Sequence, residues 1–327
     1  MSAEAVIQAI GLRKSYRSRV VLDGLSLAVH RGEMVGLLGP NGAGKTTTIS
    51  ILAGLLRPDA GEVRVAGLTP RSGGTELRRK LGFVPQSLAL YPSLSGLQNL
   101  ELFARLHGIG RRQARSESMR ALEEVGLTDR AHDPVAMLSG GMKRRLNLAC
   151  GTVHGPEVLL LDEPAVGVDP QSREQILLRV RKAAQAGAAV IYSTHYMEEV
   201  ERSCDRVLLI DHGRVVADGT VAELIARGGG HPLMEIAFAD TPPPGWHSGL
   251  AGLVELSPAV PGGRVILQLS DLAQISGVLE RARSAGARLL DFTVHSPNLS
   301  DAFMILTGHA LRDPRGGVSL RCCARPA

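Results

Sequence analysis

Aromatic side chains are scarce in this 327-residue sequence, which contains one Trp, four Tyr and five Phe. The core must therefore be mostly aliphatic. A track for single-stranded nucleic acid needs a series of aromatic surfaces on which bases can stack. The sequence offers no such series, so no nucleic-acid partner is expected.

Long apolar runs are missing as well. The longest uncharged stretch, 81–100, has the length of a bilayer span, but two prolines and three side-chain amides interrupt it. The first fourteen residues contain no apolar core of a secretory signal peptide. We therefore expect a cytoplasmic protein that does not itself cross a membrane.

Cysteine and net charge carry little information about function. The four cysteines lack metal-ligand spacing and are expected to be reduced thiols; they are Cys150, Cys204, Cys322 and Cys323. A net charge of +5 fits a plain solvated surface, with a basic face toward anionic lipid or an acidic partner as the alternative. The basic cluster at 111–120 has the same two interpretations, a solvated helical face or a contact with headgroups or a membrane subunit.

The length predicts about two domains. The composition changes after residue 227, where Gly- and Pro-rich segments begin. We expect a first domain at 1–227 with a helical subdomain at about 90–155. An α+β accessory domain is expected at 228–310, and a disordered tail rich in Arg, Gly and Pro at 311–327.

Hydrophobic patterns predict an α/β fold for the first domain. Residues 25–30 alternate as in a half-buried antiparallel strand, and residues 34–38 form a short apolar run typical of a strand buried on both faces. Further strands are expected at 158–161, 188–193, 207–210 and 214–217, and helices at 46–56, 94–130 and 171–186. Thr220 and Glu223 have the spacing of a capping box that opens one more helix. In the second domain the patterns predict strands at 233–239, 264–269 and 288–294 and a helix at 271–285.

A glycine-rich segment follows the apolar run at 34–38 and opens the helix at 46. Residues 39–46 fit the pattern G-x-x-x-x-G-K-[ST]. In this context the backbone N–H groups and the helix N-terminus bind phosphate. Lys45 would reach the β- and γ-phosphates, and the Thr46 hydroxyl would bind Mg²⁺. The alternative is a chance Gly-rich turn before a helix.

Two carboxylates follow the strand at 158–161. In an open parallel sheet, ligand groups lie at the carboxyl ends of the strands, so Asp162 and Glu163 are expected near the phosphates. Asp162 suits a Mg²⁺-directed role, and Glu163 can orient or deprotonate the attacking water. Without the phosphate loop, the same pattern would equally fit a strand followed by a solvated turn.

A second anion site is expected where Ser139, Gly140 and Gly141 open a helix. Ser139 can cap the helix, and the glycines leave its N–H groups bare. Lys143, Arg144 and Arg145 follow within the first turn, where the helix dipole disfavours cations. An anion facing this end would relieve that conflict. A glycine pair after an N-cap is otherwise an everyday loop feature.

The order of these segments resembles the nucleotide-binding domain of ATP-binding-cassette (ABC) ATPases over residues 1–225. The resemblance implies a RecA-like core with an antiparallel β subdomain and a helical subdomain, and ATP and Mg²⁺ as ligands. It makes Glu163, His195 and Lys45 catalytic, and Thr46, Gln86 and Asp162 the Mg²⁺ site. The nucleotide contacts it implies are Tyr16, Gly39, Pro40, Asn41, Gly42, Ala43, Gly44, Lys45, Thr46, Thr47, Ser139, Gly140, Gly141 and Asp169.

The resemblance also implies the partners. Two such domains pair head-to-tail in this family, so Ser139, Gly140 and Gly141 would contact the ATP of a second copy or of another ABC ATPase. Gln86 would sense Mg²⁺ and an integral membrane permease, which places the chain on the inner face of the cell membrane. Tyr16 would stack on adenine, and His195 would contact the γ-phosphate.

Two residues depart from the usual family pattern, Met142 in the signature and Val168 before Asp169. With Met142, the run 139–145 resembles export ATPases for drugs, polysaccharides and nodulation factors, and residues 295–303 resemble a C-terminal motif of the drug-resistance type. From the residues alone, 295–303 predict a loop followed by a capped helix. The main interpretation is thus the ATPase subunit of an exporter.

Two other functions are alternatives to an exporter. A soluble ABC ATPase acting on ribosomes or nucleic acid usually carries tandem cassettes or a coiled-coil insertion, and neither is present. A nucleotide-gated regulator with weak turnover is disfavoured because Glu163 and His195 are both retained.

Overall fold

The computed structural model describes residues 5–228, 230–243, 245–247, 254–257 and 264–307. The expected tail at 311–327, with Cys322 and Cys323, lies outside these residues. The chain divides into two compact units, Met1–Thr220 and Val221–Ala327. The domain boundary that we expect at 227 stays a prediction.

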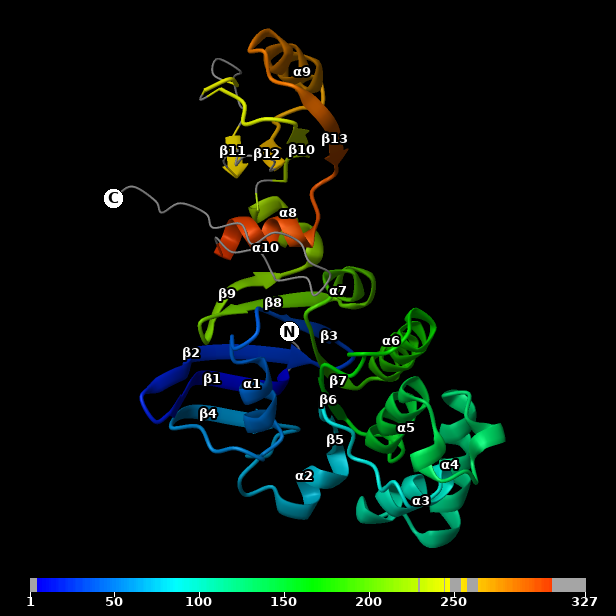
Figure 1. Cartoon of the computed structure of the whole chain (residues 1–327). Coiled ribbons are helices and arrows are strands. Elements are labelled where there is room, and N and C mark those ends of the chain that lie inside the picture. The colour runs from blue at the N-terminus through cyan, green and yellow to red at the C-terminus, as the bar shows by residue number, and fades with distance from the viewer. Residues whose placement is uncertain (1–4, 229, 244, 248–253, 258–263, 308–327) are drawn as a thin grey trace. The chain divides into compact units, whose positions relative to one another are not determined.

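The first unit contains a six-stranded sheet with the order β5-β6-β7-β3-β8-β9, drawn in Figure 1. All neighbouring strands are parallel except β8 and β9, which are antiparallel. The strands are β3 (Met34–Leu38), β5 (Leu81–Val84), β6 (Val158–Asp162), β7 (Ala189–Thr194), β8 (Arg206–Asp211) and β9 (Arg214–Gly219).

Apolar runs without alternation form the centre of this sheet because both of its faces are covered. Val35, Leu37 and Leu160 pack into one core and Met34, Leu159 and Leu161 into another, on opposite faces. All residues of β3, β6 and β7 are buried. The prediction of a strand buried on both faces at 34–38 is confirmed.

A three-stranded antiparallel sheet with the order β2-β1-β4 covers one core together with helix α1. Its strands are β1 (Ala5–Tyr16), β2 (Arg19–His30) and β4 (Ala60–Val65). Residues 25–30 belong to β2, which pairs with β1, so the predicted antiparallel strand is confirmed. Helix α6 (Pro170–Gln185) packs on the other core. Helix α7 (Met197–Ser203) lies against β3, where its Val200 approaches Gly36. Helix α1 spans Lys45–Leu52.

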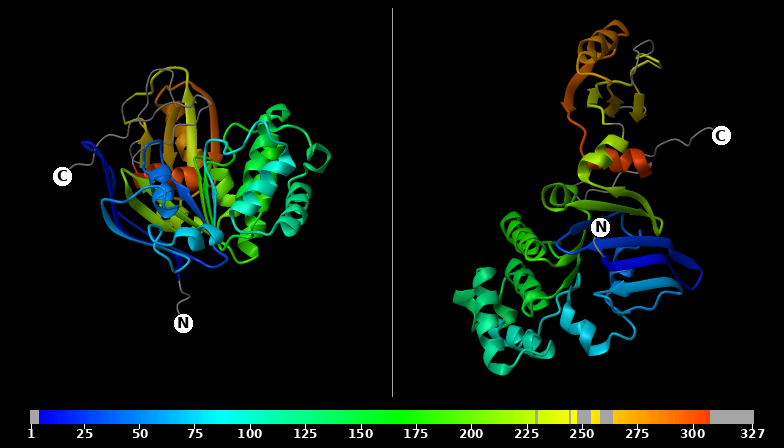
Figure 2. Two further views of the ribbon diagram at one scale, coloured as in Figure 1. Left: turned by 90° about the horizontal axis from the view of Figure 1, so that it is seen from below. Right: turned by 180° about the vertical axis from the view of Figure 1, so that it is seen from behind.

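Helices gather to one side of the six-stranded sheet, as both views in Figure 2 show. They are α3 (Gly96–Leu106), α4 (Arg111–Glu124) and α5 (Gly140–Thr152), with 3-10 turns at Thr128–Arg130 and Val135–Met137, and their apolar sides share one cluster. Helix α2 (Gly74–Lys80) precedes β5. The basic side chains of α4 are exposed, and Arg115 and Arg120 pair with glutamates, as expected for a solvated helical face.

Two predicted helices needed correction. The helix predicted at 46–56 ends at Leu52, because Gly54 adopts a left-handed φ of 74° and the N–H groups of Leu55 and Leu56 turn back to the Ser50 carbonyl. The helical region predicted at 94–130 is broken at 107–110, where Gly108 has φ 93°. Both helices thus end close to a glycine with a left-handed backbone conformation, which a pattern of apolar residues does not reveal.

The second unit contains a four-stranded antiparallel sheet with the order β11-β12-β10-β13. Its elements are α8 (Val221–Arg227), β10 (Leu233–Phe238), β11 (Val254–Ser257), β12 (Arg264–Gln268), α9 (Gln274–Ser284), β13 (Leu289–His295) and α10 (Leu299–Thr307). Helix α10 opens with reciprocal hydrogen bonds between Asn298 and Asp301 (2.9 and 3.0 Å). The loop and capped helix predicted at 295–303 are therefore confirmed.

Candidate nucleotide-binding site

The carboxyl ends of three neighbouring strands bring the predicted catalytic residues together. Strands β6, β7 and β3 are adjacent, and Glu163, His195 and Lys45 each follow the end of one of them. Lys45 and Glu163 line a pocket of about 260 Å³. Functional groups at strand ends meet at one edge of the sheet because parallel strands all end there.

The loop between β3 and α1 curls around this pocket. Gly42 and Gly44 have φ of 85° and 108°, a region that other residues rarely adopt. At Gly39, an added Cβ would stand 2.2 Å from the Ile210 carbonyl oxygen. The glycines of the pattern are thus required by the backbone path, and α1 begins directly behind the loop with its free N–H groups.

Lys45 is buried with only 6% of its surface exposed. Its Nζ donates to the carbonyl oxygens of Gly39 at 2.7 Å and Pro40 at 3.2 Å and lies 3.8 Å from Glu163 Oε1. Burial lowers the pKa of Lys45, although the charges of Glu163 and Asp162 oppose this. The ammonium group therefore stands over the loop, where a phosphate oxygen can replace the weaker carbonyl contacts.

Glu163 adopts a left-handed backbone conformation with φ 46°. Such strain is found at functional sites when surrounding groups enforce it. Here Ser193 of β7 enforces it, because its carbonyl and hydroxyl oxygens accept from the Glu163 N–H at 3.1 and 3.0 Å. The same hydroxyl donates to Asp162 Oδ1 at 2.8 Å. Ser193 was not among the predicted site residues.

The Glu163 carboxylate is contacted by the other predicted residues. Gln86 Nε2 donates to its Oε2 at 3.2 Å, and His195 Nδ1 lies 3.6 Å from its Oε1. The side chain of Glu163 keeps only 11% of its surface exposed. An amide, an imidazole and an ammonium thus surround one carboxylate at the edge of the pocket.

Arg19 is a pocket residue that the sequence analysis missed. It pairs with Tyr16 where β1 turns into β2, and its Nη2 lies 3.2 Å from the position of a Cβ on Gly42. Tyr16 is about half exposed (49%) and does not line this pocket. The hairpin therefore brings a cation to the phosphate loop and leaves the Tyr16 ring accessible.

Ser139 caps α5 as predicted, accepting from the Met142 N–H at 3.3 Å. Ser139 and Gly140 are exposed and do not line the pocket. The second glycine, Gly141, is packed: a Cβ there would lie 2.6 Å from Ser172 Oγ and 2.9 Å from Asp169 Oδ2. The start of α5 therefore lies against the start of α6.

The three cations of α5 have backbone partners within the fold. Lys143 donates to the Ala136 carbonyl at 3.1 Å and Arg145 to the Val125 carbonyl at 2.6 Å. Arg144 donates to the carbonyl of Gln86. Backbone oxygens thus stabilise these cations, and the anion site at this helix start stays a prediction that depends mainly on Ser139 and the bare N–H groups.

Asp169 caps α6, where its Oδ1 accepts from the Ser172 N–H at 2.8 Å. This backbone hydrogen bond, with further bonds to nearby groups, lowers the pKa of Asp169. The carboxylate is therefore ionised at neutral pH, at the junction of α5 and α6.

The predicted Mg²⁺ residues fit a hard cation chemically. A hydroxyl, an amide oxygen and a carboxylate are ligands that Mg²⁺ prefers. Thr46 and Gln86 line the same pocket, and the Gln86 nitrogen is used by Glu163, which leaves the amide oxygen for a cation. Within the described ranges, no three His, Cys, Asp or Glu side chains are grouped so as to hold a metal by themselves. A metal here needs oxygens from a ligand such as a phosphate.

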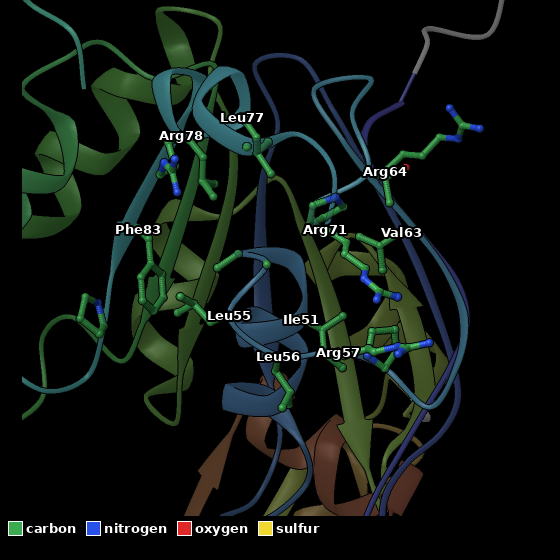
Figure 3. Close-up of a pocket in the computed structure, with 18 of the residues that line it drawn as sticks. Ile51, Leu55, Leu56, Arg57, Val63, Arg64, Arg71, Leu77, Arg78 and Phe83 are labelled. Carbon is green, nitrogen blue, oxygen red and sulfur yellow. The ribbon is translucent and has the colours of Figure 1, made fainter. Parts of the chain in front are cut away.

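A larger cavity of about 1120 Å³ lies beside the loop that carries Gln86. Figure 3 shows that side chains following α1, from β4 and α2 and from β5 converge on it. Its floor is apolar, with Leu55, Leu77 and Phe83, and four arginines stand around it: Arg57, Arg64, Arg71 and Arg78. Leu55 is 67% exposed, so part of the apolar lining of this cavity is accessible from outside.

Comparison with known proteins identifies relatives over almost the whole chain. Residues 22–166 match the family model described as ABC transporter. The linearmycin resistance ATP-binding protein of Bacillus subtilis is 38% identical over 94% of this chain and 100% of its own. The Nod factor export ATP-binding protein I of Ralstonia nicotianae is 39% identical over 94% of this chain and 95% of its own. A daunorubicin resistance ATP-binding protein of Streptomyces coeruleorubidus is 38% identical over 94% of this chain and 97% of its own.

Solved structures show the same fold. An ATP-binding subunit of an ABC transporter matches with a TM-score of 0.64 and 32% identity, covering 68% of this chain and 93% of its own. A dimeric ATP-binding cassette in a post-hydrolysis state, bound to ADP and phosphate, matches with a TM-score of 0.61 and 25% identity over 65% of this chain and 98% of its own. Among the helices of the described residues, none combines the length and apolarity that a bilayer crossing requires.

Proposed function

This chain belongs to the ABC transporter family as an ATPase subunit of the drug and Nod factor export type, and from that premise we propose how its residues bind and hydrolyse ATP. The phosphate loop, residues 39–47, wraps the β- and γ-phosphates, and Lys45 exchanges its loop carbonyls for phosphate oxygens. Arg19 adds a second cation beside the loop, and Tyr16 stacks on the adenine.

Hydrolysis depends on Glu163 and on the groups around it. Glu163 orients the attacking water and accepts its proton, and Ser193 holds the backbone that aims this carboxylate. His195, 3.6 Å from Glu163, contacts the γ-phosphate. The protein thereby positions reactants and neutralises charge, which is most of what phosphoryl transfer requires.

Mg²⁺ is the expected cofactor. Thr46, Gln86 and Asp162 would hold it, Asp162 being kept in place by Ser193. Bound there, the cation would neutralise charge that develops on the phosphate oxygens.

A head-to-tail homodimer, or a pair with a second ABC ATPase, completes the site. Ser139 and Gly140 are exposed and separate from the pocket of their own chain, so they are free to contact the γ-phosphate bound by a partner. Asp169, ionised at the junction of α5 and α6, lies beside the next residue, Gly141, and completes the contacts of the pair.

An integral membrane permease is the second partner, and it would hold the chain at the inner face of the membrane. The cavity in Figure 3 supports this proposal, because its wall includes Pro85 and Ala89 on either side of Gln86. A permease segment seated on its apolar floor would move with the loop that touches Glu163. A drug, a lipid-linked saccharide or a similar amphiphile is the class of cargo we propose; the relatives are named for linearmycin resistance, daunorubicin resistance and Nod factor export.

One observation carries the proposal, the convergence of Lys45, Gln86 and His195 on Glu163 beside a glycine-rich phosphate loop. We expect Lys45→Ala to weaken ATP binding by about tenfold to a hundredfold, the value of a charge-assisted hydrogen bond. Glu163→Gln should keep ATP binding and lower turnover at least about a hundredfold. Fluorescent-nucleotide titration and steady-state phosphate release measure the two effects.

Lys182→Ala is the matched control, because Lys182 is an exposed lysine at the end of α6. It should bind and hydrolyse ATP like the wild type. Unchanged ATP binding by Lys45→Ala would refute the phosphate-loop assignment, and wild-type turnover by Glu163→Gln would remove Glu163 from the mechanism.

A further inference from the structure

His195 lies on a turn that is tied to a buried carboxylate. The Thr194 hydroxyl accepts from the Tyr196 N–H at 3.0 Å and donates to Glu199 Oε2 at 2.7 Å. The Tyr192 hydroxyl donates to the same oxygen at 2.9 Å. Glu199 is 4% exposed, and burial raises its pKa against the opposing effect of these hydrogen bonds. The backbone on both sides of His195 is thereby fixed from inside the protein.

The side chain of His195 has a separate support. The Tyr196 ring lies with its centroid 4.2 Å from that of the imidazole, at an angle of 36°. The guanidinium carbon of Arg173 lies 4.2 Å from the same Tyr196 centroid, within cation–π distance. Arg173 Nε is also 3.4 Å from Glu199 Oε1. The ring of Tyr196 is thus in contact with a cation and with the imidazole.

Arg173 stands in the first turn of α6, where its N–H donates to the Asp169 carbonyl at 3.0 Å. The same turn receives Gly141 of α5 against Asp169 and Ser172. One turn of α6 therefore meets the Ser-Gly-Gly segment on one side and supports the ring beside His195 on the other.

We propose that Tyr196 is a positioning residue for His195 and that Arg173 holds the Tyr196 ring in place. The inference rests on the proposed role of His195 at the γ-phosphate. A planar neighbour restricts the rotation of the imidazole, whose Nδ1 also lies 3.6 Å from Glu163 Oε1. Displacement of a catalytic group by about 1 Å can cost a hundredfold in rate. The contacts use the aromatic ring of Tyr196, so phenylalanine should replace it.

The test is a set of ATPase measurements on the full chain. Tyr196→Leu should lower kcat about tenfold to a hundredfold and leave the KM for ATP within about twofold, because ATP binding does not use this ring. Tyr196→Phe should restore the wild-type kcat. Arg173→Met should reproduce the loss, and the double variant should be no slower than either single variant, since the two side chains act as one unit.

A spectroscopic signal separates positioning from a general loss of structure. The Tyr196 ring current shifts the imidazole protons of His195, so their NMR signals should move in Tyr196→Leu and stay in Tyr196→Phe. Arg173→Met also removes the cation beside the buried Glu199 and should lower the thermal stability. Tyr196→Leu leaves Arg173 beside Glu199. It is therefore the variant that tests positioning without removing this ion pair.

Arg202→Gln is the matched control, because Arg202 joins α7 to α6 through an exposed ion pair with Glu174 at 3.1 Å. Among the described residues, no hydrogen bond, ion pair or ring contact links it to Tyr196 or His195. This variant should turn over like the wild type. Wild-type turnover by His195→Ala would overturn the proposed role of His195 itself. An inactive His195→Ala beside a fully active Tyr196→Leu, or a Tyr196→Phe as slow as Tyr196→Leu, would overturn only the positioning role.

Discussion

His107 and His154 lie ring over ring, with centroids 3.7 Å apart and planes within 1° of parallel. His107 Nδ1 donates to the Arg78 carbonyl at 2.7 Å, and His154 Nε2 donates to the Leu81 carbonyl at 3.2 Å. Burial and the neighbouring imidazole lower the pKa of His154 to about 4, and burial also lowers the pKa of His107. Both rings are therefore neutral at pH 7 and join α3 and the end of α5 to the segment around β5.

This pair predicts an acid-sensitive fold. The unfolded chain takes up a proton at a pKa near 6.5 and folded His154 only near 4, so the unfolded state binds more protons in between. The free energy of unfolding should fall as the pH drops from about 7 to 4, by up to about 1.4 kcal/mol per pH unit. His154→Gln keeps a donor for Leu81 and should lose less thermal stability between pH 7 and pH 5.5 than the wild type.

The exposed His132 provides the control for this measurement. His132→Gln should show the wild-type decline with pH. An equal decline in His154→Gln and the wild type would show that His154 does not cause the acid sensitivity.

Single residues also show which parts of the site could be predicted from the sequence and which could not. Lys45 and Glu163 were predictable because each follows an apolar strand within a short pattern. Ser193 was not, because its role depends on the register that sets it opposite Asp162, and register is absent from a local pattern. Arg19 reaches the phosphate loop only through the hairpin of β1 and β2.

At the scale of elements, the adjacent glycines of α5 differ in their surroundings. A Cβ on Gly140 meets nothing within 4 Å, whereas one on Gly141 would stand 2.6 Å from Ser172 Oγ. We expect Gly140→Ala to leave the free energy of unfolding unchanged or raise it slightly, since alanine favours helix. Gly141→Ala should lower it by about 1 kcal/mol or more, because α5 must move away from α6.

Urea denaturation of the nucleotide-free chain measures both substitutions. Each variant serves as the control for the other, since both add one methyl group to the same helical turn. Equal unfolding midpoints would contradict the close contact between α5 and α6.

Many of the elements were predictable from the sequence. Strands buried on both faces and the capped start of α5 have strong local patterns. Helix α2 and strands β4, β5 and β11 were not predicted; β5 and β11 have four residues each, too few to reveal a period of two. The carbonyl partners of the α5 cations, at Gln86, Val125 and Ala136, were not predictable, because they lie in other segments that only the fold brings close.

At the scale of the whole molecule, the proposed pairing determines how the phosphate loop and the Ser-Gly-Gly segment are distributed over the two sites of a dimer. A twofold pair of identical chains contains two equivalent composite sites. In the proposed pair, each site takes its phosphate loop from one chain and Ser139 from the other. A defect in either segment then inactivates both sites of a homodimer, whereas in a mixed pair the two defects fall in the same site and leave the other site intact.

Two inactive variants should therefore restore activity when they are mixed. Lys45→Ala removes the ammonium group that contacts the phosphates. Ser139→Asp keeps the cap of α5, since Asp is a good N-cap, but sets a negative charge against the γ-phosphate, while Ser139→Asn is its neutral control. A mixed pair contains one intact site and one with both defects. If chains exchange freely and sites act independently, an equal mixture should reach about a quarter of the wild-type ATPase rate. A mixture as inactive as its components would mean that each chain completes its own site.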